Sequence, residues 1–427
     1  MQQPPATPDL IVNARLPRWL LPPDWPTEGS EPALALIELA DGRVSRIAPS
    51  ATRSAHTGLV WDVQGAPTLP GMIDVHTHLD KAFILPRIGP VQPGLLGAIA
   101  ATIDDRVNWT REDVRQRAER GLKWAWEAGT THLRTHIDWW DPQTPPAAWE
   151  VMTELAAEWR GRIRIEQVAM IPLALFQDPD CARALAQRVS GTGKHALLGG
   201  LVHSVNWNPA ALRHLVMAAQ TFDLDLDLHV DEELNPDAQG LALVASLLCE
   251  TGFTGRVVCG HNCALSALTE AQALATLDAV ANAPITLVSL PITNLLRQDA
   301  THGRTPRLRG LTLVKEARER GIPLLFGSDN VQDPFCRAGS FDPIEAMQTA
   351  ALAGQLDTPF DTWSDALCRS DWLQRQSASR PSLVGSSADL VVFTTSDTHA
   401  WPSRAAPRVV IRHDQAISQN SLKDLSS

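Results

Sequence analysis

The sequence predicts an α/β fold: a (β/α)8 TIM barrel with a small flanking β domain built from both chain ends. Short apolar runs rich in β-branched residues alternate with longer amphipathic stretches, which is typical of βα units and a parallel sheet. Eight such units can be counted, and further short strand-like runs occur near both ends of the chain. An open doubly wound sheet is the alternative fold, but it needs a glycine-rich phosphate turn that we do not find in the sequence.

The barrel strands are predicted where short β-prone runs are bounded by polar or turn-forming residues. They are Met72–His76, Thr131–Ile137, Arg164–Ile171, Ala196–Val202, Leu224–His229, Arg256–Cys259, Ile285–Leu290 and Pro323–Phe326. Amphipathic spacing predicts helices at Val114–Ala128, Pro209–Phe222, Gly240–Glu250, Leu265–Val280, Leu311–Arg320 and Pro343–Leu352. Gly129 directly follows the first of these helices, as a C-capping glycine does.

The two chain ends carry a different pattern, in which short strand-like runs are separated by turn residues. These runs are Leu10–Val12, Ala35–Glu38, Val44–Ile47, Val60–Val63, Ala388–Phe393 and Arg408–Ile411. They predict one small β-sandwich-like domain made of residues 1–66 plus 385–427, beside a barrel made of residues 67–384.

The composition argues against several classes of protein. The 427 residues hold 37 Lys and Arg against 48 Asp and Glu, a formal net charge of 37 − 48 = −11, with no basic run, so a nucleic-acid partner is not expected. The chain shows neither a secretory signal nor an apolar run of about 18 residues, so we expect a cytoplasmic protein with no membrane partner. The six cysteines form no Cys-x-x-Cys pair and are expected to be reduced. The chain has no tyrosine, so no phenol can act in catalysis.

The most informative local pattern is the His-x-His pair that ends the segment Leu69–Asp80. Residues i and i+2 of a strand point to the same face, so His76 and His78 can both aim their imidazoles into one barrel mouth. Two neutral imidazoles at that spacing suit a divalent transition metal. Two histidines that are merely packed or solvated at a strand end are the alternative.

Three further candidates lie at the carboxyl ends of later predicted strands, where barrel enzymes place their chemistry. They are His229 with Glu232, His261 after Cys259 and Gly260, and Asp329 between Ser328 and Asn330. Each of them alone can be a structural cap for nearby backbone. Together, strands 1, 5, 6 and 8 present His-x-His, His, His and Asp to one rim.

These residues resemble the motifs of the amidohydrolase superfamily and, within it, of the cytosine deaminase group. The matching segments are Pro70–Asp80, Arg134–Asp138, His229–Glu232, His261 and Ser328–Asn330. The resemblance implies that His76, His78, His229 and Asp329 bind one divalent metal ion, Zn²⁺ or Fe²⁺. A second ion in this superfamily usually needs a carbamylated lysine at the end of strand 4, where this chain has Val202 and His203, so a single ion is expected.

The resemblance also implies a role for each catalytic candidate. Asp329 takes the proton of a metal-bound water whose pKa falls toward about 7. Glu232 protonates a ring nitrogen and helps the amine to leave, and His261 stabilises the charge that develops on the attacking oxygen. Attack at a C–NH₂ carbon of an amidine-like ring then releases ammonia.

The chain departs from cytosine deaminases on the substrate side. A glutamine that reads the amide edge of cytosine at the end of strand 3 is replaced by Pro172 or Leu173, so we expect a different ring. Asn330 stands where cytosine deaminases have a second aspartate, as in the group that includes N-isopropylammelide hydrolases. The expected substrate contacts are Asn330, Leu173, Trp207, Lys81 and His203; Trp139 and Trp140 are further stacking candidates, and His136 is a candidate support of the site.

The sequence therefore predicts a metal-dependent hydrolytic deaminase of a small neutral nitrogen heterocycle, such as a cytosine-like pyrimidine or a triazine. Its partner is a small-molecule substrate, and a homo-oligomer remains open. One alternative is a hydrolase that removes an N-alkyl amine from a triazine-like ring or opens a cyclic amide. Another is a barrel that binds a ligand without turning it over, although such a protein needs no metal cage with a proton shuttle beside it.

Overall fold

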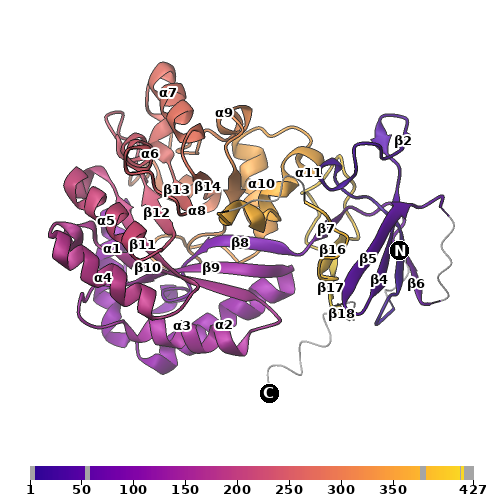
Figure 1. The fold of residues 1–427 in the computed structure, drawn as a ribbon, viewed down its shortest axis with the longest axis horizontal. Helices are drawn as coiled ribbons and strands as arrows, with labels where there is room; N and C mark the ends of the chain where they lie inside the picture. The colour runs from indigo at the N-terminus through magenta and orange to yellow at the C-terminus, as the bar shows by residue number, and fades with distance from the viewer. Residues whose placement is uncertain (1–4, 53–57, 376–380, 414, 418–427) are drawn as a thin grey trace.

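A computed structural model describes residues 5–52, 58–375, 381–413 and 415–417 of the chain. Eight parallel strands follow one another in chain order in a single sheet, which confirms the predicted barrel (Figure 1). Their bounds are β8 Met72–Thr77, β9 Thr130–Asp138, β10 Arg164–Ile171, β11 Ala196–Val202, β12 Leu226–Val230, β13 Val257–His261, β14 Ile285–Ser289 and β15 Leu324–Phe326.

The two edges of this sheet meet, so the alternative of an open doubly wound sheet is wrong. Thr77 in β8 forms a parallel bridge with Asp329, just after β15, and the backbone N–H of Asp329 donates to the His76 carbonyl over 2.8 Å. The carboxylate of Asp74 accepts hydrogen bonds from the backbone N–H of Ser328, over 3.0 Å, and from its hydroxyl. The seam of the barrel is therefore fixed beside the aspartate that the sequence analysis singles out.

Helices cover the outside of the barrel. They are α1 Leu95–Asp105, α2 Arg111–Ala128, α3 Ala147–Glu158, α4 Pro179–Gly191, α5 Pro209–Thr221, α6 Gly240–Thr251, α7 Glu270–Ala281, α8 Pro291–Arg297, α9 Val314–Glu319, α10 Pro343–Ala353 and α11 Pro359–Thr362. The predicted helix Leu265–Val280 is wrong in its first part, because Thr269 and Gln272 form a capping box that starts α7 at Glu270. The predicted helix Leu311–Arg320 is shorter in the structure, where Val314 is its first residue.

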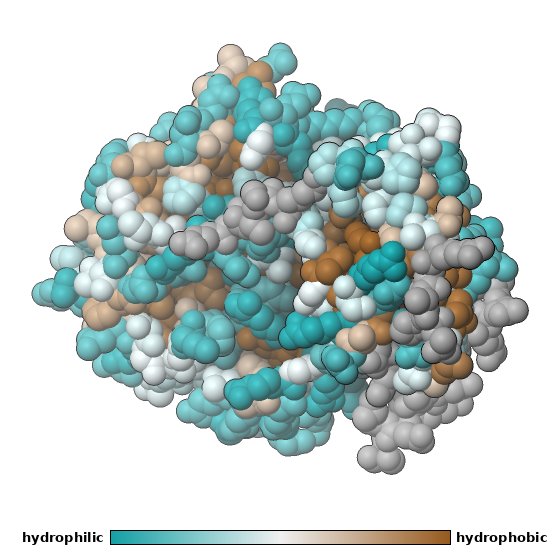
Figure 2. Space-filling model, turned by 45° about the vertical axis from the view of Figure 1, so that its right-hand side comes forward, coloured by the Kyte–Doolittle hydropathy of each residue, from teal (hydrophilic) through white to brown (hydrophobic). Residues whose placement is uncertain are grey.

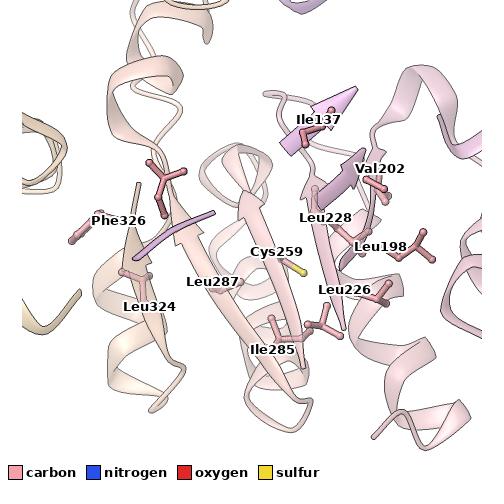
Figure 3. Packing of buried hydrophobic residues seen from close by; sticks show 14 of the residues in the cluster. Ile137, Leu198, Val202, Leu226, Leu228, Cys259, Ile285, Leu287, Leu324 and Phe326 are labelled. Atoms are coloured by element: carbon pink, nitrogen blue, oxygen red, sulfur yellow. The ribbon is translucent and has the colours of Figure 1, made fainter. Parts of the chain in front are cut away.

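Alternation along the strands separates the core from the site. In β12, Leu226, Leu228 and Val230 belong to the hydrophobic cluster that the outer helices share, while Asp227 and His229 occupy the alternate positions. Figure 3 shows this cluster in the equivalent positions of neighbouring strands, where Cys259, Leu287 and Leu324 are among its labelled members. The polar positions of the strands therefore point into the barrel.

A one-residue bulge in β8 sets the direction of the His-x-His pair. Asp74 is paired with Leu133 and Thr77 with Thr135, so three steps along β8 match two along β9. Such a bulge re-aims the side chains beyond it. Neighbouring residues of a regular strand face opposite sides. Because of the bulge, Ile73 and Val75 lie in a buried cluster with Val258, and His76 also faces the interior of the barrel.

Two four-stranded sheets form the flanking domain, at the right of Figure 1. One has the order β5-β4-β1-β6, with β1 Leu10–Ala14, β4 Ala35–Ala40, β5 Arg43–Pro49 and β6 Val60–Asp62. The other has the order β18-β17-β16-β7, with β7 Thr68–Pro70, β16 Leu390–Phe393, β17 Arg408–Arg412 and β18 Gln415–Ile417. One cluster with members such as Ile11, Ile37, Leu390 and Ile411 joins both sheets. A small hairpin, β2 Thr27–Glu28 with β3 Glu31–Pro32, lies between β1 and β4 in the chain.

The surface is mostly hydrophilic, as expected when the apolar residues are buried in the cores of the barrel and of the flanking domain (Figure 2). Hydrophilic residues cover most of the face seen in Figure 2, and apolar residues show between them in several places. Within the part of the chain that the structure describes, none of the helices combines the length and apolar character needed to cross a bilayer.

Candidate active site

Four side chains from three strand ends converge inside the carboxyl end of the barrel. The Nε2 atom of His229 lies 3.1 Å from Nε2 of His76 and 3.3 Å from Nε2 of His78. The Oδ1 atom of Asp329 lies 3.3 Å from Nε2 of His78 and 3.7 Å from Nε2 of His76. The structure thus brings together the four residues predicted as metal ligands.

The chemistry of this donor set fits a divalent ion. Tetrahedral coordination at metal–nitrogen distances of about 2.0–2.1 Å puts ligand atoms about 3.3–3.4 Å from one another, close to the separations found here. Both carboxylate oxygens of Asp329 are buried and lack a well-formed hydrogen bond among the described residues. An uncompensated carboxylate in such a place is costly, and a cation between it and the imidazoles removes that cost.

The protonation states of these groups suit the same interpretation. Burial, and then the neighbouring histidines, hold the pKa values of His76 and His229 well below the usual value, so both imidazoles are neutral at pH 7. Burial by itself raises the pKa of the Asp329 carboxyl, but His78 and His261 outweigh it and keep that pKa below its usual value. Neutral imidazoles and an ionised carboxylate are the forms in which these residues bind metals.

The backbone around the site is specialised. Asp329 and His261 adopt the left-handed region, with φ of 62° and 69°, which is uncommon for residues other than glycine and clusters at functional sites. Gly260 lies where a Cβ atom would come within 2.9 Å of Cε1 of His76. A side chain at position 260 would therefore displace a candidate ligand.

The two predicted proton-transfer residues face each other next to these ligands. The Nε2 atom of His261 lies 3.7 Å from the Glu232 carboxylate, and both side chains are buried. Burial raises the pKa of Glu232, which favours its protonated form. A ligand atom of His261 also lies within 4.8 Å of ligand atoms of His76 and His229.

Asn294, which is not among the predicted site residues, orients His261. Its Oδ1 atom lies 3.0 Å from Nδ1 of His261, so the Nδ1–H donates to it and Nε2 is left toward the site. The hydroxyl of Thr312 donates to the backbone carbonyl of the same histidine over 2.5 Å. Asn294 lies on α8, after β14, and follows no strand-end motif of its own, so only the fold reveals the contact.

A column of charged side chains lies beneath the site, inside the barrel. Arg134 donates to Glu166 and to Asp227, with 2.7 Å between the closest atoms of each pair. His132 approaches Glu166 within 3.1 Å at one end, and His136 approaches Asp227 within 3.5 Å at the other. The His136 ring centroid is 4.0 Å from that of His76, so this residue packs directly against a candidate ligand.

Lys81 and Asn330 are buried at the rim, and both are held by carboxylates. The Lys81 ammonium donates to Asp138 over 2.7 Å, and Arg106 donates to the other oxygen of Asp138 over 3.0 Å. The side-chain amide of Asn330 donates to Asp333 over 2.6 Å.

The other expected substrate contacts lie in different surroundings. Leu173 is buried in the hydrophobic core, and so is Trp139, whose ring packs against Trp149 at 5.2 Å. His203 accepts a hydrogen bond from the backbone N–H of Val205 and caps a short 3₁₀ helix. Trp207 is 41% exposed.

Lys194 precedes β11 in the chain, so it lies at the opposite end of the barrel from the place where a bridging carbamylated lysine would stand. It lines a cavity of about 570 Å³ at the amino ends of the strands, together with Arg164 and His195. Val202 and His203, at the carboxyl end of β11, offer no amine for a bridging carbamate.

Comparisons with known proteins agree with the fold. A model described as "Amidohydrolase family" matches residues 92–413. The pterin deaminase of Rhizobium rhizogenes (strain K84 / ATCC BAA-868) is 37% identical over 388 residues, which cover 90% of this chain and 88% of that protein.

Two solved structures share the fold over nearly the whole chain. The 5-methylcytosine deaminase from Klebsiella pneumoniae liganded with 5-fluorocytosine has a TM-score of 0.76 and 23% identity, covering 96% of this chain and 97% of that one. The N-isopropylammelide isopropylaminohydrolase from Burkholderia multivorans ATCC 17616 has a TM-score of 0.72 and 21% identity, covering 96% and 98%.

Proposed function

Because the chain belongs to the amidohydrolase family, we propose that it is a metal-dependent hydrolytic deaminase of an amino-substituted nitrogen heterocycle. The observation that carries the proposal is the convergence of three imidazole nitrogens and one carboxylate beside the facing pair Glu232 and His261. The similarity to a pterin deaminase supports pterin as the first substrate to test.

We propose that His76, His78, His229 and Asp329 hold one divalent ion, Zn²⁺ or Fe²⁺. Such an ion lowers the pKa of a water molecule bound to it toward about 7. The donor set of three histidines and one aspartate supports either metal.

The residues of the chain move the protons. Asp329 is placed to accept a proton from the attacking water at a carboxylate oxygen. The raised pKa of Glu232 supports its carboxyl as the acid that protonates a ring nitrogen and then assists the departing amine. With Nδ1–H donated to Asn294, Nε2 of His261 is left to accept a hydrogen bond from the attacking water, and it holds that oxygen in position as it adds to the ring carbon.

A panel assay tests the function. The metal-replete enzyme is given pterin, cytosine, isocytosine, 5-substituted cytosines and aminotriazines, and ammonia release is measured. Ammonia from one of these rings, abolished by Glu232→Gln, supports the proposal. No ammonia from any of them, with metal bound, contradicts it.

A second candidate function is removal of an N-alkyl amine from a triazine-like ring. Asn330 favours it, as does the 26% identity over 207 residues to the N-isopropylammelide isopropyl amidohydrolase of Pseudomonas sp. (strain ADP), which covers 47% of this chain. Assaying isopropylamine release from N-isopropylammelide separates the two functions, because they differ in the leaving group. The cytoplasmic location stays a prediction.

A further inference from the structure

An apolar slot opens at the carboxyl rim of the barrel, beside the site formed by His76, His78, His229 and Asp329, which we call the His/Asp site. It encloses about 240 Å³, and its walls include Ile99, Met170, Pro172, Leu201, Phe335 and Trp140. Flat apolar walls with few polar groups are typical of sites that bind aromatic rings. The volume suits a small ring system rather than a large ligand.

Two residues that line the slot are neighbours of the candidate ligands. Leu201 in β11 is the register partner of His229 in β12, and paired residues of neighbouring parallel strands share one face. Lys81, which also lines the slot, follows His78 by three residues in the same loop. A flat molecule with one end at the His/Asp site can therefore extend into the slot.

The two cations of the slot share one carboxylate. Lys81 and Arg106 both donate to Asp138, over 2.7 and 3.0 Å. The guanidinium of Arg106 also stacks on Trp140, with 4.0 Å to the ring centroid. An anionic group entering the slot would have to compete with the Asp138 carboxylate for these cations.

The uncharged polar groups of the slot are also engaged. The hydroxyl of Thr102 donates to the Ala98 carbonyl, and the side-chain amide of Asn206 donates to the Leu201 carbonyl. One donor of a charged residue is not engaged: Nε of Arg106 is buried and has no hydrogen-bond partner among the described residues. A ring nitrogen or carbonyl oxygen is a suitable neutral acceptor for that donor.

We infer that the slot holds the uncharged second ring of a fused bicyclic substrate, whose amino-bearing ring lies at the His/Asp site. This inference rests on the proposed function. It makes Ile99, Leu201 and Trp140 determinants of specificity, and it predicts a preference for fused two-ring substrates over single pyrimidine or triazine rings.

The test fills the slot from α1, the helix that forms one of its walls. In a Glu232→Gln background, where turnover is blocked, Ile99→Trp should weaken pterin binding by about tenfold or more, measured by quenching of pterin fluorescence. Leu96→Trp is the matched control, because Leu96 is exposed on the same helix and lies outside the slot. The control should bind pterin within about twofold of its parent, and cytosine binding should be the same in all three proteins.

The outcomes distinguish a failure of the slot proposal from a failure of the proposed deamination. Unchanged pterin binding in Ile99→Trp, equal weakening of pterin and cytosine, or no pterin binding by the parent overturns the inference. If Ile99→Trp weakens pterin binding but the wild-type enzyme releases no ammonia from pterin, the proposed deamination fails and the slot stands. If the wild-type enzyme releases ammonia from pterin and Ile99→Trp has no effect, the slot fails alone.

The charge of the ligand gives an independent measurement. Pterin-6-carboxylate should bind more weakly than pterin, because its carboxylate meets cations already paired with Asp138. Tighter binding of the carboxylate would show that Lys81 or Arg106 exchanges Asp138 for the ligand, and it would overturn the preference for an uncharged ring.

Discussion

The Nε2 atoms of His76 and His229 lie 3.1 Å apart. A neutral imidazole carries one N–H, so one of these nitrogens can donate to the other, but Nε2 of His78 also lies 3.3 Å from Nε2 of His229. Three ring nitrogens that meet in this way cannot all be satisfied by one another. A shared cation satisfies all three at once and also compensates Asp329.

Removal of the ion should therefore inactivate and destabilise the enzyme. We expect Asp329→Asn to lose bound metal and activity, measured by elemental analysis and ammonia release, because the amide brings no charge to the ligand set. We also expect a chelator to lower the melting temperature of the wild-type protein and added metal to restore it in a concentration-dependent manner. A fully metallated, active Asp329→Asn enzyme would contradict the assignment.

Glu232→Gln should separate catalysis from metal binding. The amide keeps the shape of the side chain but can no longer exchange a proton, so we expect kcat to fall by about 10²–10⁴ while the metal content is unchanged. Glu270→Gln, on the exposed first turn of α7, is the control and should behave like the wild type. Unchanged turnover in Glu232→Gln would remove this residue from the mechanism.

Asn294 should act through His261. Asn294→Leu removes the acceptor of the Nδ1–H, so we expect kcat to fall by about 10–100-fold with KM and metal content little changed. Asn294→Asp keeps an acceptor oxygen at that position and should retain more of the activity. If the leucine and aspartate variants are equally impaired, orientation of His261 is not the reason.

The sequence predicts most of the fold because the barrel strands carry their own signals. Two of the predicted strands, Arg164–Ile171 and Ala196–Val202, have the bounds found in the structure, since turn-forming residues flank both of them. The helix α3, Ala147–Glu158, was missed although its buried face, which includes Trp149 and Leu155, has helical spacing. The start of α7 was missed although the capping pair Thr269 and Gln272 is visible in the sequence.

The sequence predicts those residues of the candidate site that lie at or just after the carboxyl ends of barrel strands. His76, His78, His229 and Asp329 could be placed together because barrel strands deliver their last residues to one rim. The contact between His261 and Asn294 and the slot between α1 and β11 depend on how separate elements pack, and no local pattern encodes that. The bulge that turns His76 inward is likewise a property of the β8–β9 pair.

Arg134 should be the most sensitive position in the charged column. Arg134→Met leaves the buried Glu166 and Asp227 without their shared cation, so we expect the free energy of unfolding to fall by about 3–5 kcal/mol. Arg213→Met breaks the exposed pair with Glu250 and should change it by less than about 1 kcal/mol. Denaturant unfolding of both variants measures the difference, and equal effects would contradict a special role for the column.

The carboxylate of Asp105 should hold α1 against the slot. Burial raises the pKa of this group, but hydrogen bonds from Arg87, Asn108 and Trp109 outweigh burial and lower the pKa below 3.8. A lowered carboxyl pKa contributes stability above the unfolded-state value, and that stability is lost only as the pH falls through the folded-state value.

Hydrogen exchange of residues 95–105, corrected for intrinsic rates, should therefore be equal at pH 7 and pH 5 in the wild type. Asp105→Asn should accelerate it at pH 7, and Asp104→Asn, at an exposed position on the same helix, should not. A loss of protection between pH 7 and pH 5 that the wild type shows and Asp105→Asn does not would mean that the pKa of Asp105 is raised, and it would contradict this assignment.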